Sequence, residues 1–365
     1  MEDNSFKSAL SVNEGVNQPP SVNDDSVIQF IRKTRKKLTV QEYVEGILAG
    51  NRTILSQAIT LVESSLPTHA KQAQEIIEKC LPYSGKSLRL GITGVPGVGK
   101  STFIEAIGKY LTAQGKKISV LAIDPSSERS KGSILGDKTR MEQLSVDPNA
   151  FIRPSPSAGS LGGVARKTRE TIILCEAAGF DTIFIETVGV GQSETAVHSM
   201  VDFFLLLMLA GAGDELQGIK RGIMEMADAI AITKADGNNL SKAELAAVQY
   251  ANALHLFPKS PSGWSPKVLL CSAVKDFGID AIWQSILDYV AQTQENQFFY
   301  NRRREQAKYW MYETINEALH RHFYHHPNIE HKLEDYEQRV LDDQLSSFTA
   351  ARKLLQKYFG PEKIE

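Results

Sequence analysis

Short, nearly continuous apolar runs alternate with amphipathic stretches through the middle of the chain. Runs of this length without regular polar interruption are typical of strands that are buried on both faces, and the intervening stretches are typical of the helices that cover them. The pattern predicts an α/β fold over residues 87–292, with a mostly parallel sheet covered by helices on both faces. The expected strands are 88–93, 118–123, 182–186, 203–209, 229–233 and 268–270.

The two ends of the chain lack such apolar runs and differ from the middle in composition and in the spacing of their apolar residues. Over residues 38–86 apolar positions recur at helical spacing, with Gly50 and Pro67 between the periodic stretches, which predicts a helical N-terminal extension. Residues 293–365 are dense in charge and again helical in period, so we expect helices that pack on the core or on a second copy. Residues 1–37 are rich in Ser, Asn, Asp and Lys, which predicts a poorly ordered arm.

Composition narrows the possible functions. The 365 residues carry 41 Lys and Arg against 43 Asp and Glu, a net charge of −2 that argues against nucleic acid as the main partner. The longest apolar run, 203–210, is far shorter than the roughly 20 residues of a membrane-spanning helix, so we expect no membrane partner. The first residues lack the pattern of a secretory signal, which favours a cytoplasmic location.

Cys80, Cys175 and Cys271 lack Cys-x-x-Cys spacing and are expected to be buried, reduced thiols.

The segment GVPGVGKS at 94–101 fits the phosphate-loop pattern G-x-x-x-x-G-K-[ST] at every fixed position. A predicted strand enters it and a helical pattern leaves it, so backbone amides would surround phosphates at a helix N-terminus. Lys100 would place its charge on the outer phosphates, and the Ser101 hydroxyl would bind Mg²⁺. The expected phosphate-binding residues are Gly94, Val95, Pro96, Gly97, Val98, Gly99, Lys100, Ser101 and Thr102.

Carboxylates at strand ends are expected near this loop. Glu186 ends a predicted strand where GTPases often have the Asp of Asp-x-x-Gly, and Gly189 would offer its backbone amide to a γ-phosphate. Asp124 and Asp137 lie between the loop and Glu186, and which carboxylate binds the metal directly stays open. The candidate catalytic residues are Lys100, Asp124, Asp137, Glu186 and Gly189, and the candidate Mg²⁺ ligands are Ser101, Asp124, Asp137 and Glu186.

Two later segments indicate the base of the nucleotide. The segment TKAD at 233–236 is close to the Asn-Lys-x-Asp segment of GTPases, although Thr233 departs from the usual Asn. The Asp236 carboxylate can accept hydrogen bonds from both N1–H and the 2-amino group of guanine, whereas adenine presents an acceptor there. The segment CSA at 271–273 fits the Ser-Ala segment that closes over guanine. These positions favour GTP over ATP, and the expected base-binding residues are Lys234, Asp236, Ser272, Ala273 and Val274.

Two further features concern regulation and metals. The glycine-rich stretch 211–222 is a candidate partner-sensing loop. Val190 follows Gly189 where many small GTPases have the Gln that orients the attacking water, which predicts slow intrinsic hydrolysis. Five histidines gather in the tail, at 320, 322, 325, 326 and 331, but no ligand constellation accompanies them, so we expect surface histidines.

Together these segments resemble the MeaB/ArgK group of P-loop GTPases, the chaperones of methylmalonyl-CoA mutase. The resemblance spans about residues 40–289. It implies a signal-recognition-type fold, a homodimer formed by the C-terminal helices, binding of GTP, GDP and Mg²⁺, and turnover coupled to loading and rescue of an adenosylcobalamin-dependent mutase. It also matches Gln217 and Lys220 to the switch that contacts the mutase. The strings that carry it include 58–64, 91–102, 124–127, 132–141, 186–194 and 213–220.

Two other interpretations stay open. One is an ATP-dependent kinase or ATPase of a lysine/arginine/ornithine transport system, a label often given to this family, against which Asp236 argues. The other is a GTPase that inserts a metal such as nickel, which the tail histidines would suit.

Overall fold

A computed structural model describes residues 38–123, 141–155, 161–187, 193–211 and 221–360. Contacts divide the chain into residues Met1–Thr39 and Val40–Glu365, and the architecture below is that of the second unit. Among the helices in these described ranges, none combines the length and the apolar character that a bilayer span needs.

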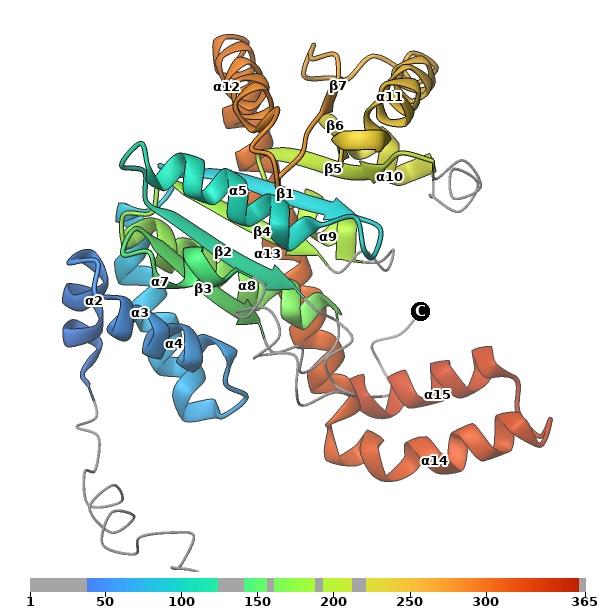
Figure 1. The fold of residues 1–365 in the computed structure, drawn as a ribbon. Helices are drawn as coiled ribbons and strands as arrows, with labels where there is room; N and C mark the ends of the chain where they lie inside the picture. The colour runs from blue at the N-terminus through green and yellow to red at the C-terminus, as the bar shows by residue number, and fades with distance from the viewer. Residues whose placement is uncertain (1–37, 124–140, 156–160, 188–192, 212–220, 361–365) are drawn as a thin grey trace, which may run out of the picture. The chain divides into compact units, whose positions relative to one another are not determined.

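A parallel sheet forms the centre of this unit (Figure 1). Its strands follow the order β3-β2-β4-β1-β5-β6-β7, and every pairing between them is parallel. The predicted α/β class with a mostly parallel sheet is confirmed. The strands are β1 (Leu88–Gly94), β2 (Ile118–Ile123), β3 (Ala150–Ser155), β4 (Thr182–Thr187), β5 (Phe203–Leu209), β6 (Ala229–Thr233) and β7 (Lys267–Leu270).

Strand β3 was not expected from the sequence. Its apolar run is only three residues long, because Arg153 and Pro154 follow directly. It lies at one edge of the sheet and pairs only with β2, where a proline costs no hydrogen bond to a second neighbour.

Helices cover both faces of the sheet, as the alternation predicts. Leu205 and Leu207 of β5 pack in the cluster that includes α5 and α12, whereas Leu206 and Met208 pack with α10 and α11 on the opposite face. The covering helices are α5 (Lys100–Thr112), α7 (Glu142–Val146) and α12 (Ile279–Glu295) on the first face, and α8 (Leu161–Ala177), α9 (Ser193–His198), α10 (Arg221–Met226) and α11 (Leu240–Leu254) on the second.

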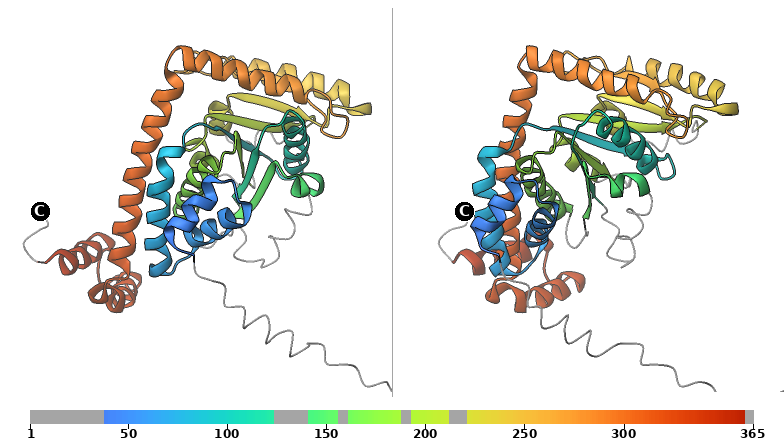
Figure 2. Two further views of the ribbon diagram at one scale, coloured as in Figure 1. Left: turned by 90° about the vertical axis from the view of Figure 1, so that its left-hand side faces the viewer. Right: turned by 60° about the vertical axis from the view of Figure 1, so that its left-hand side comes forward.

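Further helices lie at both ends of this unit. On the N-terminal side, α2 (Val40–Leu48), α3 (Arg52–Glu63) and α4 (Pro67–Cys80) contact one another and pack on α8. On the C-terminal side, α13 (Phe298–Tyr324) turns away from α12 and continues to α14 (Pro327–Leu341) and α15 (Ser347–Phe359), as Figure 2 shows. The α14–α15 pair has a small apolar cluster of its own, around Ile329, Tyr336 and Leu354.

A buried polar network holds α13 on the core. Arg303 of α13 donates to both carboxylate oxygens of Asp202, at 2.7 and 2.6 Å, and to the carbonyl oxygens of Gly85 and Ser87, each at 2.6 Å. Asp202 directly precedes β5 and also accepts a hydrogen bond from the Arg89 backbone amide of β1, at 2.8 Å. The first half of α13 is therefore attached to the amino ends of β1 and β5, which lie side by side in the sheet.

Candidate functional site

The phosphate loop connects β1 to α5 at the carboxyl end of the sheet. Gly94, Gly97 and Gly99 have φ angles of 152°, 80° and 95°, a region that side chains disfavour. A Cβ atom at Gly94 would lie 2.4 Å from the Leu207 carbonyl oxygen, so that position excludes any other residue. The glycines of the motif are thus required by backbone conformation and, at Gly94, also by close approach to β5.

Two polar side chains lie at the start of α5. The Lys100 ammonium is buried and donates to the carbonyl oxygens of Gly94, at 2.8 Å, and Val95, at 3.3 Å, so it lies inside the curve of the loop. The Ser101 hydroxyl donates to Glu186 Oε1 at 3.4 Å. Glu186 is brought there because β4 pairs with β1, with Glu186 opposite Ile92. A hydroxyl and a carboxylate are the oxygen ligands that suit Mg²⁺, so this pair fits that ion.

A second group of side chains follows β6. The Thr233 hydroxyl donates to the Val98 carbonyl oxygen at 2.7 Å and so joins the end of β6 to the phosphate loop. Thr233, which stands where GTPases usually have Asn, therefore still donates a hydrogen bond to the loop. Lys234 has a φ of 56°, unusual for a residue with a side chain, and its ammonium donates to the Gly97 carbonyl oxygen at 2.9 Å.

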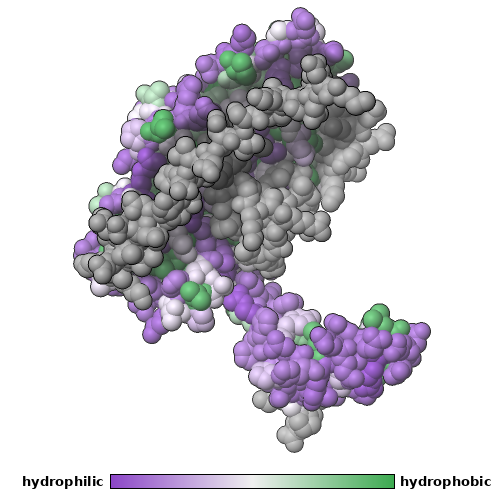
Figure 3. Space-filling model, turned by 60° about the horizontal axis from the view of Figure 1, so that its bottom comes forward, coloured by the Kyte–Doolittle hydropathy of each residue, from purple (hydrophilic) through white to green (hydrophobic). Residues whose placement is uncertain are grey.

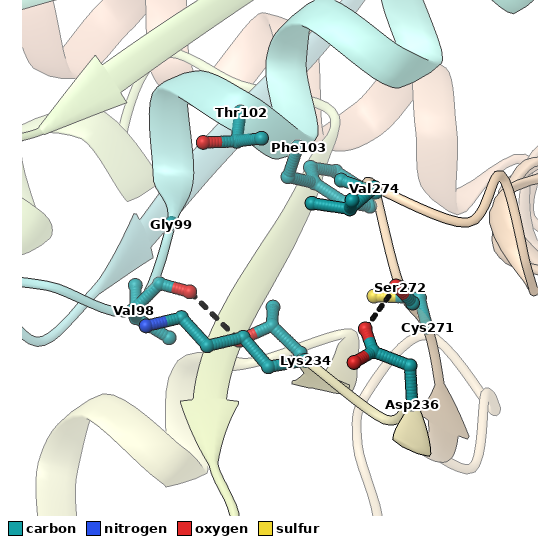
Figure 4. A pocket seen from close by; sticks show the side chains of 11 residues that line it. Val98, Gly99, Thr102, Phe103, Lys234, Asp236, Cys271, Ser272 and Val274 are labelled. Atoms are coloured by element: carbon teal, nitrogen blue, oxygen red, sulfur yellow. Dashed lines mark hydrogen bonds between the residues drawn. The ribbon is translucent and has the colours of Figure 1, made fainter.

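The base-binding candidates meet around a cavity of about 260 Å³ (Figure 4). The Ser272 hydroxyl donates to Asp236 Oδ2, and the Lys275 backbone amide donates to the Ser272 hydroxyl at 3.3 Å, which fixes the carboxylate at the wall. Phe103 and Val274 lie next to each other on another side, as Figure 4 shows. The lining consists of Val98, Gly99, Thr102, Phe103, Thr233, Lys234, Asp236, Cys271, Ser272, Ala273 and Val274.

The structure thus brings the two predicted halves of a nucleotide site together. Val98 and Gly99 line the cavity and also belong to the phosphate loop, so the loop and the cavity adjoin. Sequence reasoning did not name Phe103, Thr233 and Cys271 as binding residues. Phe103 and Cys271 stood at positions typical of core packing, and Thr233 was noted only as a departure from Asn. The candidates Asp124, Asp137, Gly189, Gln217 and Lys220 lie outside the described residues, as does Val190.

The cysteines and the tail histidines are the other residues that the sequence singled out for possible chemistry. Burial raises the pKa of the Cys80 thiol to about 11 and those of Cys175 and Cys271 to about 12, and all three are unpaired, as expected. His322 Nδ1 lies 2.6 Å from the Tyr358 hydroxyl, and His326 Nδ1 accepts from the Asn328 backbone amide at 3.3 Å. Within the part of the chain that the structure describes, no three His, Cys, Asp or Glu side chains gather to hold a metal ion.

The chain is similar to several known proteins. The family model described as methylmalonyl-CoA mutase-associated GTPase MeaB matches residues 55–328. A probable GTPase of Mycobacterium tuberculosis is 48% identical over 318 residues, covering 87% of this chain and 95% of that protein. The mitochondrial methylmalonic aciduria type A homolog of Mus musculus is 46% identical over 329 residues, covering 87% and 79%. A crystal structure titled LAO/AO transport system kinase aligns with a TM-score of 0.71 at 38% identity, covering 88% of this chain and 97% of that one.

Proposed function

The chain belongs to the MeaB family of methylmalonyl-CoA mutase-associated GTPases and is a GTPase, and from this membership we propose that it couples GTP hydrolysis to cobalamin loading and protection of a methylmalonyl-CoA mutase. The observation that carries the proposal is the family match over residues 55–328, which includes every described residue of the nucleotide site. We further propose that the protein acts in the cytoplasm.

Guanine recognition is assigned to the cavity beside Lys234 and Asp236. The Asp236 carboxylate would accept from N1–H and the 2-amino group, while Ser272 keeps it in position. Ala273 and Val274 would close over the base, and the stem of Lys234 would lie along it while its ammonium stays on the Gly97 carbonyl oxygen. Adenine would leave the half-buried Asp236 carboxylate facing an acceptor, which is the physical basis for GTP specificity.

The phosphate side is assigned to the loop and to Glu186. The Lys100 ammonium, already inside the loop, would turn from carbonyl oxygens to phosphate oxygens when nucleotide binds. Ser101 and Glu186 would hold Mg²⁺ directly or through its water, and the ion when bound neutralises charge on the phosphates. Asp124, Asp137 and Gly189 are proposed to complete this side.

Partner control is assigned to Gln217 and Lys220. Both precede α10, which packs against β5 and α9. With Val190 in place of a water-orienting Gln, hydrolysis is proposed to be slow until the mutase engages this segment.

A homodimer through the C-terminal helices is part of the proposal. Met311, Ile315 and Leu319 are 46–58% exposed and recur at four-residue spacing on α13, and Leu341 and Phe348 near the α14–α15 junction are exposed by 77% and 85%. On the side seen in Figure 3, the surface of these helices is otherwise mostly hydrophilic. Gln306 and Trp310 are buried against the core, so α13 has to be kept, and the test combines truncation after Tyr324 with Ile315→Glu and Leu319→Glu on its exposed stripe. A monomer by light scattering supports the proposal, and a persistent dimer contradicts it.

Cofactor loading is the direct test of the proposed function. Purified apo-mutase is mixed with adenosylcobalamin, and holo-mutase is followed by cobalamin absorbance with this protein and GTP, a non-hydrolysable GTP analogue or ATP. We expect loading that is controlled by GTP hydrolysis and is lost in Lys100→Ala. Loading that is indifferent to the protein or to the nucleotide would contradict the proposal, and control by ATP would favour the transport-kinase alternative.

A further inference from the structure

A second cavity, of about 560 Å³, lies at the end of the sheet opposite the nucleotide site. Asp228, one of its lining residues, directly precedes β6, so the cavity faces the amino ends of the parallel strands. Its walls come from α10, from residues 254–266 before β7 and from the first turns of α13. The volume is within the range of small-molecule sites, roughly 300–1,000 Å³.

The walls of this cavity are mainly apolar and firmly held. Phe257, Trp264 and Phe298 line it, together with prolines of the loop before β7. The Trp264 indole donates to the Asp228 carbonyl oxygen at 2.8 Å, and its ring meets Tyr289 edge to face at 5.5 Å. Trp264 is only 7% exposed, so the wall keeps its shape without a ligand.

Arg302 and Asp228 place a donor and an acceptor side by side in the lining. Their side chains are 14% and 11% exposed, and the 3.6 Å between Arg302 Nη1 and Asp228 Oδ2 is longer than a hydrogen bond. Other contacts hold each group: Asp228 Oδ2 accepts from the Phe204 backbone amide at 2.8 Å, and Arg302 lies 3.1 Å from the Tyr289 hydroxyl and 3.0 Å from His198 Nε2. Arg302 also donates to the carbonyl oxygens of Asp202, at 3.3 Å, and His198, at 3.5 Å. A ligand oxygen would replace one of these longer contacts and bridge the pair while the shorter contacts stay.

The charges of the lining favour a neutral ligand. Arg302 and Lys259 are positive, whereas Asp228, Glu225 and Glu305 are negative. Burial, together with the charge of Arg302, lowers the pKa of His198 to about 4, so its imidazole is neutral near pH 7. Positive and negative side chains are thus mixed in the lining. A charged head group on the ligand would lie beside a side chain of its own sign as well as one of the opposite sign, so the cost of removing it from water would not be recovered.

We propose that this cavity binds a small neutral molecule with an apolar body and a carboxamide head, whose oxygen accepts from Arg302 and whose nitrogen donates to Asp228. The apolar body would lie between Trp264, Phe257 and Phe298. This inference is independent of the proposed chaperone function, because none of these residues belongs to the nucleotide site.

Three probes with the same ring test the proposal: benzamide, benzoate and benzylamine, each titrated into the full chain with saturating GDP and followed by ligand-observed NMR. We expect benzamide to bind with a dissociation constant on the order of 1 mM, and the two charged probes at least tenfold more weakly. Equal binding of a charged probe, or no binding of benzamide, would overturn the proposal.

Two substitutions in the lining test whether benzamide binds in this cavity. Asn301→Phe, at an exposed lining position of α13, and Glu225→Phe, at an exposed lining position of α10, should each weaken benzamide binding at least tenfold. Arg304→Phe, which is exposed on the same helix outside the lining, should change it less than twofold and serves as the matched control. Benzamide binding that survives both cavity variants would contradict the assignment, while GDP in every titration separates this result from the state of the nucleotide site.

Discussion

Replacing Arg303 by methionine should weaken the attachment of α13 to the core. The substitution removes four hydrogen bonds, two to the Asp202 carboxylate and two to the carbonyl oxygens of Gly85 and Ser87. The Asp202 side chain is 2% exposed, so it would remain a buried carboxylate, supported by the Arg89 backbone amide.

The magnitude follows from this burial. Breaking a buried ion pair by removal of one partner costs roughly 3–5 kcal/mol. Because the Arg303 side chain is itself 15% exposed, water can reach part of the gap, and we expect the low end, about 3 kcal/mol of unfolding free energy. Asp202→Asn in the same protein removes the stranded charge, so the double variant should be less destabilised than the sum of the two single variants.

The assay is urea unfolding followed by circular dichroism, with Arg304→Met as the control. Arg304 is the next residue, is exposed and donates to Asn301 within the same helix, so its loss should cost less than about 0.5 kcal/mol. Equal unfolding free energies for Arg303→Met and Arg304→Met would refute the reasoning that this network holds α13 to the core.

Three further changes test other parts of the account. Burial raises the pKa of Asp228 to about 6, above its unfolded value, so the folded protein loses stability as this carboxyl ionises. In urea unfolding, the free energy of unfolding of wild type should fall by about 1–3 kcal/mol relative to Asp228→Asn as the pH rises from about 4 to about 6. His198, with its pKa lowered to about 4, acts in the opposite direction but is present in both proteins. Gly94→Ala should abolish binding of fluorescent GDP, because its Cβ would lie 2.4 Å from a carbonyl oxygen. Gly115→Ala, which shares a positive φ (79°) but has open space around it, should lose some stability and still bind GDP. Asp236→Asn should weaken GTP about 10- to 100-fold in competition titrations and improve xanthosine triphosphate, and unchanged selectivity would contradict the base assignment.

The sequence predicted the sheet well because six of its strands are short, mainly apolar runs. It failed for β3, where Arg153 and Pro154 interrupt the run. Arg153 stays polar because its guanidinium binds Glu63 of α3, a contact across 90 residues that no local pattern reveals.

The candidate site was predictable to a similar extent. Fixed spacing identified the phosphate loop, and strand-end position identified Glu186, which lies within 3.4 Å of Ser101. The role of Thr233 was not predictable from the short motif, since its hydrogen bond to Val98 depends on how β6 meets the loop. The Arg303–Asp202 network joins residues that are 101 positions apart and needed the fold to bring them together.

The most direct test of the central claim is GTP hydrolysis at fixed Mg²⁺, with ATP as control, measured with and without a purified adenosylcobalamin-dependent methylmalonyl-CoA mutase. The account predicts slow hydrolysis of GTP alone, little or none of ATP, and strong stimulation of GTP turnover by the mutase that Lys220→Ala removes. GTP turnover that the mutase leaves unchanged would contradict the proposed partnership, and a preference for ATP would contradict the assignment of Asp236 to guanine.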